Sequence, residues 1–213
     1  MPFSITNVMA VSLDGRIASH PAERDEARQR LGFTNHDDRA HLLELLQSTD
    51  AVIVGSASML ASGGAFVGLN DRGVQPIWAV MTNRGLPEGA PFLAQAEIPR
   101  WLVSQQPLSL PPHIGSLRTI TYADESPALV LAKALQASGV ERVLLFGGSE
   151  INRIFYNAGL VDHLILTLCP MILGSYAAIG LIAPPLDEPV KLALIAVQTK
   201  GNLVFLRYNV QKV

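Results

Sequence analysis

Residues 143–160, VLLFGGSEINRIFYNAGL, constrain the fold most strongly, because an apolar strand, a glycine pair and a helix follow one another directly. Gly147 and Gly148 would let the backbone pass close to a ligand. We expect Ser149 to cap a helix whose first turn, apolar face and stop fall at Glu150, Ile151, Ile154, Phe155 and Gly159. Because a helix N-terminus offers unpaired N–H groups and the positive end of a dipole, this segment predicts a phosphate-binding turn.

The same order of elements also occurs where glycine merely allows a helix to pack closely on a strand. The full dinucleotide fingerprint G-x-G-x-x-G is absent from this turn. The phosphate-binding interpretation therefore depends on a second element elsewhere in the chain.

Size and composition indicate one globular unit. Of 213 residues, 49% are hydrophobic, enough to bury a sizeable core, and we expect a single domain spanning residues 1–213. Only 16% of the residues are charged, and the mean hydropathy is +0.29. This balance favours apolar surface buried against a second copy, so we predict a homodimer.

Charge, cysteine count and hydropathy pattern exclude several classes of protein. A net charge of −2 without a basic block argues against nucleic acid as a partner. The single cysteine, Cys169, cannot form an internal disulfide or a multi-cysteine zinc site, and we predict no metal. No apolar run reaches the roughly 20 residues that cross a bilayer, and no basic segment precedes the first apolar run. We expect a cytoplasmic protein that makes no membrane contact.

Short apolar strands alternate with helical patterns along the chain, which is the signature of an α/β fold. We predict strands at 5–13, 51–54, 76–81, 101–104, 119–122 and 163–169, and a terminal hairpin of 190–199 and 203–210. Helices are expected from Thr34 or Asn35 to about Ser48, and from Ser126 to Gly139. The charged segment 20–30 is expected to be a solvated loop.

A second strand-to-helix turn has small residues like the first. Gly55 closes an apolar strand, and Ser56, Ala57 and Ser58 open a short helix. A cofactor with two phosphates would use both turns. The strand that follows ends in the polar, cationic sequence Thr82, Asn83, Arg84.

Four segments together resemble one family over nearly the whole chain. VMAVSLDGRIA (8–18), DDRAHLLELLQSTDAVIVG (37–55), LLFGGSEINRIF (144–155) and LVDHLILTLCPMILG (160–174) resemble, in order, the reductase domain of the bacterial riboflavin-biosynthesis deaminase-reductase. That family shares the dihydrofolate reductase fold. The resemblance implies a mostly parallel central sheet flanked by helices with a C-terminal antiparallel hairpin. With one cysteine, the chain cannot carry the zinc-deaminase pattern of the other half of such enzymes.

The resemblance also implies that NADPH lies across the carboxyl ends of the strands. The nicotinamide would border Ala10 and the turn from Ser12 to Gly15, and the second strand-to-helix turn would contribute Gly55 and Ser58. The adenosine and its 2′-phosphate would meet Thr82, Asn83 and Arg84, because arginine is a permanent cation with fork geometry. The pyrophosphate would lie on the remaining group, Gly147, Gly148, Ser149, Glu150 and Ile151.

The substrate half departs from the family pattern. A D-D-P-x-L-x-x-x-R-like run that binds the sugar phosphate is replaced from Ser62, Gly63 and Gly64 through residues 65–69. Phe146 stands where the family usually has an acid before the glycine pair. Leu46 stands where the family often has an arginine near the end of the preceding helix. Arg39 is kept, and we assign it to substrate binding. The sequence does not name the substrate.

Hydride transfer needs a group that balances the charge developing on the substrate. The candidates are Asp14, Asp37 and Asp38, the last two because dihydrofolate reductase places its acid on the corresponding helix. A turn aspartate, and carboxylates in the first turn of a helix, also occur without any function. We therefore predict an NADPH-dependent reductase of a ribosylaminopyrimidine. The open alternatives are a reductase of a pterin or another small heterocycle, and a non-catalytic NADPH-binding paralogue.

Overall fold

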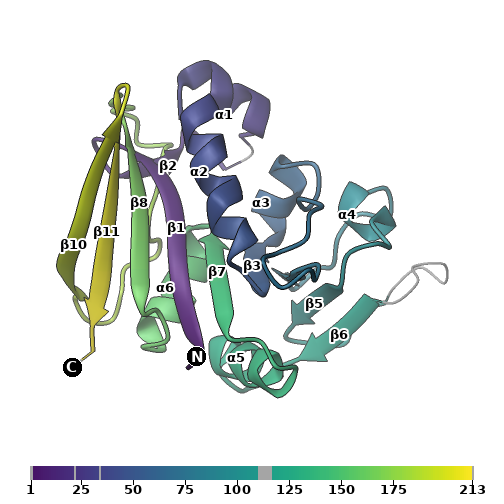
Figure 1. Ribbon diagram of the computed structural model, residues 1–213. Coiled ribbons are helices and arrows are strands. Elements are labelled where there is room, and N and C mark those ends of the chain that lie inside the picture. The colour runs from purple at the N-terminus through teal and green to yellow at the C-terminus, as the bar shows by residue number, and fades with distance from the viewer. Residues whose placement is uncertain (1, 22, 34, 110–116, 213) are drawn as a thin grey trace.

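A nine-stranded sheet runs through the computed structural model, which describes residues 2–21, 23–33, 35–109 and 117–212 (Figure 1). Its strands are β1 (Ser4–Ser12), β3 (Ala51–Gly55), β4 (Ile77–Met81), β5 (Arg100–Ser104), β6 (Leu117–Thr121), β7 (Arg142–Gly147), β8 (His163–Cys169), β10 (Lys191–Lys200) and β11 (Leu203–Gln211). A separate two-stranded sheet consists of β2 (Arg16–Ala18) and β9 (Ile179–Gly180). The helices are α1 (Asp25–Leu31), α2 (His36–Gln47), α3 (Ser56–Ala61), α4 (Pro91–Ala94), α5 (Pro127–Ala137) and α6 (Ser149–Asn157).

The strand order is β10-β11-β8-β1-β7-β3-β4-β5-β6. Every pairing from β8 to β6 is parallel, whereas β11 pairs antiparallel with both β8 and β10. The predicted mostly parallel sheet with a C-terminal antiparallel hairpin is therefore confirmed. The parallel strands end at one edge of the sheet, which is where ligands bind in open α/β folds.

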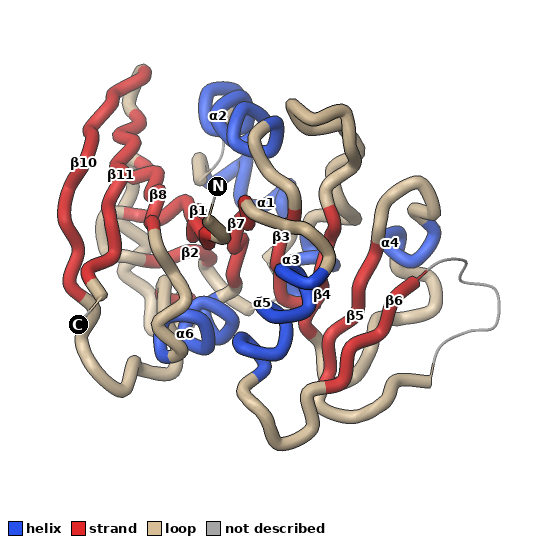
Figure 2. The backbone as a smooth tube through the Cα atoms, turned by 60° about the horizontal axis from the view of Figure 1, so that its bottom comes forward, coloured by secondary structure: helices blue, strands red, loops and turns tan. Residues whose placement is uncertain are grey.

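Helices cover both faces of the sheet, as comparison of Figures 1 and 2 shows. Side chains alternate along β3, so that Ala51 and Ile53 pack in one buried cluster with α5 and α6, while Val52 and Val54 pack in another with α2, α3 and α4. All five residues of β3 are buried. A strand buried on both faces reads as a continuous apolar run, which explains why the sequence pattern located the central strands well.

The expectation of a solvated loop at 20–30 is wrong, because Asp25–Leu31 forms α1. Asp25 and Glu26 lie in the first turn and Arg28 and Arg30 in the last, an arrangement that the helix dipole favours. Gly32, with φ of +87°, ends the helix. The charged residues that suggested a loop are thus placed to favour a helix. The expectation of solvent exposure agrees with the structure, because α1 buries none of its residues.

The other helix starts and stops follow the sequence more closely. Asn35 caps α2 by accepting from the backbone N–H groups of Asp37 and Asp38, whereas the alternative cap, Thr34, lies outside the described residues. Ser149 is not the cap of α6, because Gly148 occupies that position and Ser149 is the first helical residue. The short elements α4 and β9 have no sequence prediction.

Of the helices in the described ranges, none is long and apolar enough to cross a membrane.

Candidate cofactor and substrate site

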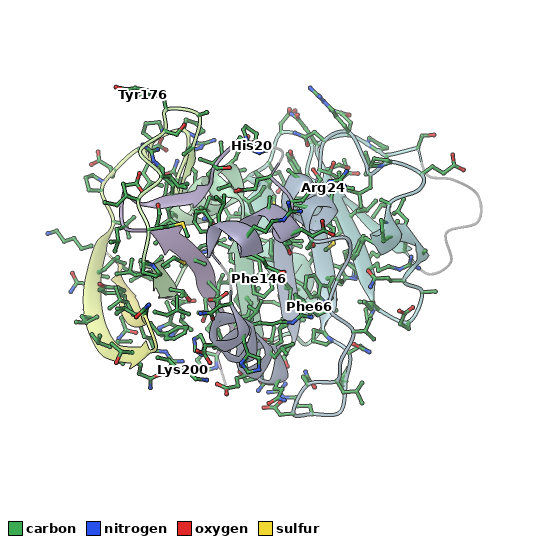
Figure 3. All side chains as sticks on the ribbon, turned by 90° about the horizontal axis from the view of Figure 1, so that it is seen from above. His20, Arg24, Phe66, Phe146, Tyr176 and Lys200 are labelled. Carbon is green, nitrogen blue, oxygen red and sulfur yellow. The ribbon has the colours of Figure 1, made fainter. Side chains whose placement is uncertain are left out.

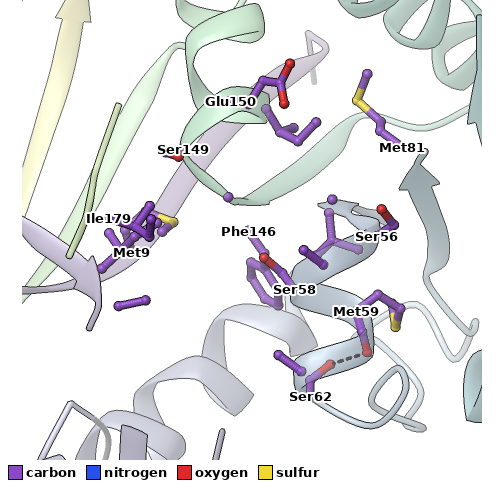
Figure 4. Close-up of a pocket in the computed structure, with 18 of the residues that line it drawn as sticks. Met9, Ser56, Ser58, Met59, Ser62, Met81, Phe146, Ser149, Glu150 and Ile179 are labelled. Atoms are coloured by element: carbon purple, nitrogen blue, oxygen red, sulfur yellow. Dashed lines mark hydrogen bonds between the residues drawn. The ribbon is translucent and has the colours of Figure 1, made fainter. Parts of the chain in front are cut away.

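A cleft of about 800 Å³ opens at the carboxyl ends of β1, β3, β4 and β7. Its lining includes most of the predicted cofactor residues, namely Ala10, Gly55, Ser58, Thr82, Asn83, Arg84, Gly148, Ser149, Glu150 and Ile151. Figure 4 shows Ser56 and Ser58 on α3 on one side of this space, and Ser149 and Glu150 at the start of α6 on another. Residues from four separate segments of the chain thus meet around one cavity.

The glycine pair has a backbone that other residues rarely adopt. Gly147 has φ of +66° and Gly148 has φ of +39°. A side chain on Gly147 would overlap the Asn152 side chain, with the added Cβ 2.8 Å from Asn152 Cγ. A side chain on Gly148 would meet only Ser58 Oγ, at 3.5 Å. Gly147 is therefore fixed by packing, while Gly148 borders the open cleft.

A buried polar network beneath the turn holds this backbone in place. Asn7, on β1, donates to the Leu145 carbonyl at 2.8 Å and to Asn152 Oδ1 at 3.0 Å. Asn152 donates to the Leu181 carbonyl at 2.9 Å, and Tyr156 Oη lies 3.3 Å from Asn7 Oδ1. Asn7 and Asn152 are completely buried. Sequence analysis did not identify either residue, although an asparagine within an apolar strand signals a buried polar contact.

The predicted adenosine end consists of the β4 terminus and a neighbour that the sequence did not indicate. Thr82 Oγ1 donates to the Gly85 carbonyl at 2.9 Å and closes the turn. Asn83 Oδ1 accepts from Tyr122 Oη at 2.8 Å and from the Gln105 N–H at 3.2 Å. Tyr122 lines the cleft, and Arg84 lines it with an exposed side chain. An aromatic ring and an accessible guanidinium thus lie at the same end.

The turn after β1 is only partly in the cleft. Ala10 lines it, whereas Ser12, Asp14 and Gly15 do not. Asp14 accepts from Ser12 Oγ at 2.6 Å and from the backbone N–H groups of Leu173 and Gly174 at 3.1 and 2.9 Å. The Ser12 hydroxyl and these backbone donors lower the pKa of Asp14 to about 2. In this position Asp14 joins the turn after β1 to the loop after β8.

The two aspartates of α2 have opposite environments. Asp37 pairs with Lys200 at 3.0 Å beside a separate hollow of about 340 Å³, and the Lys200 ammonium lowers the pKa of its carboxyl group. Asp38 lines the main cleft, and burial raises the pKa of its carboxyl group against the opposing effects of the Thr167 hydroxyl, Arg28 and His41. A carboxyl group with a raised pKa inside a cleft is a candidate proton donor. Of the three predicted acids, only Asp38 has this setting.

The residues that depart from the family pattern also gather at the cleft. Ser62, Gly64 and Phe146 line it, and so does Phe66 from the replaced run, whereas Gly63 does not. Arg39 is exposed and does not line the cleft, but its guanidinium carbon lies 5.8 Å from the Phe66 ring centroid. Viewed from above, Phe66 and Phe146 lie in the middle of the molecule, whereas Tyr176 lies at its edge (Figure 3).

The sheet topology defines the class of fold as dihydrofolate reductase-like. The fold is similar to that of dihydrofolate reductase from Enterococcus faecalis in complex with NADP(H), with a TM-score of 0.54, 12% identity and complete coverage of both chains. It is more similar to a pyrimidine reductase-like protein from Corynebacterium diphtheriae, with a TM-score of 0.78 and 18% identity over 99% of this chain and 92% of that one.

The chain belongs to the family described as the RibD C-terminal domain, whose model matches residues 4–206. Among characterised relatives, it is 25% identical to the 2,5-diamino-6-ribosylamino-4(3H)-pyrimidinone 5′-phosphate reductase of Methanothermobacter thermautotrophicus, over 99% of both sequences. The predicted family is therefore confirmed, and a nicotinamide cofactor is the expected redox partner of this fold.

Proposed function

We propose that the chain is an NADPH-dependent reductase of a ribosylaminopyrimidine intermediate in riboflavin biosynthesis, or of a closely related substrate, acting in the cytoplasm where that cofactor is found. The observation that carries the proposal is the continuity of the cleft, which runs from the glycine turn at Gly148 to the carboxyl group of Asp38. The name of the archaeal relative supports the substrate class.

The residues of the cleft fit such a cofactor. The N–H groups at the start of α6 and α3 have no side-chain cap, so they remain available to phosphate oxygens. Gly148 leaves the approach open, and Arg84 can pair with a 2′-phosphate. When bound, NADPH would supply a hydride.

Asp38 is assigned the proton that accompanies the hydride. Its carboxyl group is held on a capped helix beside β8, and burial favours the protonated form at higher pH than usual. As a hydride adds to the carbon of a C=N or C=O bond of the substrate, the electrons of that bond move to the nitrogen or oxygen, and a protonated Asp38 can donate its proton to that atom, which is general acid catalysis. Phe146, Leu42 and Met9 line the same cavity with apolar surface and limit the access of water.

Purified protein supplied with NADPH and the ribosylaminopyrimidinone should oxidise NADPH, and the loss of NADPH absorbance measures this oxidation. Expression in a riboflavin auxotroph that lacks this reductase should restore growth. Binding of NADPH without any turnover would instead favour the non-catalytic paralogue.

We expect NADPH to bind about tenfold or more tightly than NADH, because Arg84 would form a charge-assisted contact with the 2′-phosphate. Arg84→Gln should weaken NADPH binding while leaving NADH binding nearly unchanged. Titration by calorimetry measures both affinities. Arg118→Gln is the matched control, because Arg118 stacks on Trp101 at 4.4 Å and does not line the cleft. Equal affinities for the two nucleotides would refute the assignment of the β4 terminus.

A homodimer is expected from the edge strand β10. Four of its side chains are 40 to 56% exposed and apolar: Leu192, Leu194, Ile195 and Val197. An exposed apolar edge strand readily pairs with another chain. Light scattering should give twice the chain mass for the parent and for Leu129→Glu, a control on α5, and the single chain mass for Leu194→Glu. A monomeric parent at micromolar concentration would contradict this expectation.

A further inference from the structure

Three aromatic rings, Phe66, Trp78 and Phe146, form what we call the aromatic wall of the cleft. The Phe66 and Trp78 ring centroids are 6.3 Å apart, and those of Trp78 and Phe146 are 5.9 Å apart in an edge-to-face arrangement. All three residues line the cleft. Phe66 and Phe146 are 80 positions apart in sequence, yet both rings pack against the ring of Trp78.

Phe146 stands where the family pattern predicts an acid, and Phe66 lies in the replaced run at a position that is apolar in the family pattern as well. Because both phenylalanine rings pack against one indole ring, they form one continuous aromatic surface. Such a surface favours a planar ring, since aromatic pairs are stabilised by ring electrostatics in addition to the burial of apolar area. It offers no charged group to a phosphate.

The charged residues that line the rest of the cleft also disfavour a phosphate group. Apart from Glu150 at the start of α6, the acidic residues of the lining are Glu23, Asp25 and Asp38. Apart from Arg84 at the end of β4, Arg28 is the only arginine or lysine of the lining among the described residues, and its guanidinium lies 4.0 Å from the Asp25 carboxylate. The imidazoles of His20 and His41 also line the cleft, and burial lowers the pKa of His41, which favours its neutral form. Arg39 adds its charge outside the lining, over the Phe66 ring.

A phosphate dianion entering between these residues would lose water and face the carboxylates of Glu23 and Asp25, with Arg28, already paired with Asp25, as the nearest cation of the lining, which is unfavourable. On the basis of the function proposed above, we propose that the substrate is an uncharged planar heterocycle that lies on the aromatic wall and carries no phosphate. The class remains that of the aminopyrimidines and related rings, in which a nitrogen or oxygen atom can accept the Asp38 proton while a neighbouring N–H group donates to the Asp38 carbonyl oxygen.

Binding of the ribosylaminopyrimidinone, with and without its 5′-phosphate, tests the proposal directly. Trp78 fluorescence reports occupancy of the wall when Trp101 is replaced by Phe, because these are the two tryptophans of the chain. With the NADPH-saturated protein, we expect the unphosphorylated compound to bind about tenfold or more tightly. Equal or tighter binding of the phosphate ester, or no binding of either compound, would overturn the proposal.

Two variants separate the wall from its surroundings. Phe66→Arg, which introduces a cation into the lining, should shift the preference towards the phosphate ester by about tenfold. Val67→Arg is the matched control, because Val67 is adjacent, 56% exposed and outside the lining, and it should leave the ratio unchanged. An equal shift in both variants would assign the effect to overall charge and would contradict the role of the wall.

The two proposals fail in different ways. Turnover of the phosphate ester in preference to the unphosphorylated compound would overturn this inference and leave the proposed reductase function intact. Tight binding of the unphosphorylated compound without oxidation of NADPH would support the inference and refute the proposed activity.

Discussion

Gly148→Val should fold and lose its response to NADPH. A valine side chain at φ of +39° projects into the space between the starts of α6 and α3, near Ser58 Oγ. Backbone strain of this kind costs about 1–3 kcal/mol, which a protein of this size should survive. Saturating NADPH at roughly 1,000 times its dissociation constant stabilises a native protein by about 4 kcal/mol, a rise in melting temperature of roughly 8–16 °C. We expect that rise in the parent and none in the variant.

Gly159→Val separates strain from ligand contact. Gly159 follows the same helix, has φ of +65°, and has open space where a Cβ would lie. Both variants should melt at lower temperature than the parent without nucleotide, because valine is strained at either position. Only Gly159→Val should regain stability with NADPH. A Gly148→Val protein that shows the full NADPH shift would falsify the assignment of this turn to the cofactor.

Gly147 shows why the two glycines are not equivalent. A side chain there would meet Asn152, which is completely buried and bonded to Asn7 and to the Leu181 carbonyl. Substitution would therefore disturb the network that joins β1, α6 and the segment before β10. The glycine pair combines one position fixed by the core with one left open to the cleft.

The sequence predicts the central elements well because they are buried on both faces. The apolar runs of β3, β4 and β5 leave little ambiguity about strands, and glycine marks the end of β3 at Gly55 and the end of β7 at Gly147. Local capping also identifies α2, because Asn35 bonds the helix start directly. These signals are local in sequence.

The parts of the site that sequence analysis missed depend on contacts between distant segments. Trp78 is read as an ordinary core residue of β4 until Phe66 and Phe146 pack on it. Arg28 belongs to a helix that was predicted as a loop, so its place in the cleft could not be foreseen. The environments of Asp37 and Asp38 differ through Lys200, at the end of β10, and through burial beside β8. Adjacent residues in a helix point in directions about 100° apart, and the sequence does not say which direction meets the cleft.

Asp38→Asn should lower kcat by about 10²- to 10⁴-fold, the usual range for loss of a general acid, while NADPH binding stays near the parental value. An asparagine keeps the shape of the side chain and removes the transferable proton. In the parent, activity should fall as pH rises through the raised pKa of Asp38, because only the protonated carboxyl group can donate. A pH profile of kcat measures this limb, and the variant should lack it.

Asp37→Asn is the matched control for the loss of activity. The pH dependence of the free energy of unfolding tests the two residues independently, because their pKa values are shifted in opposite directions. The folded-state pKa of Asp38 is raised. The contribution of Asp38 to the free energy of unfolding is therefore complete below its unfolded-state pKa and is lost as pH rises through its folded-state pKa. The folded-state pKa of Asp37 is lowered by Lys200, so its contribution is present above the unfolded pKa and is lost as pH falls through the folded value. At about pH 8, Asp38→Asn should therefore melt above the parent and Asp37→Asn below it, with only the former losing activity. Loss of activity in Asp37→Asn with full activity in Asp38→Asn would transfer the catalytic role to the other carboxyl group.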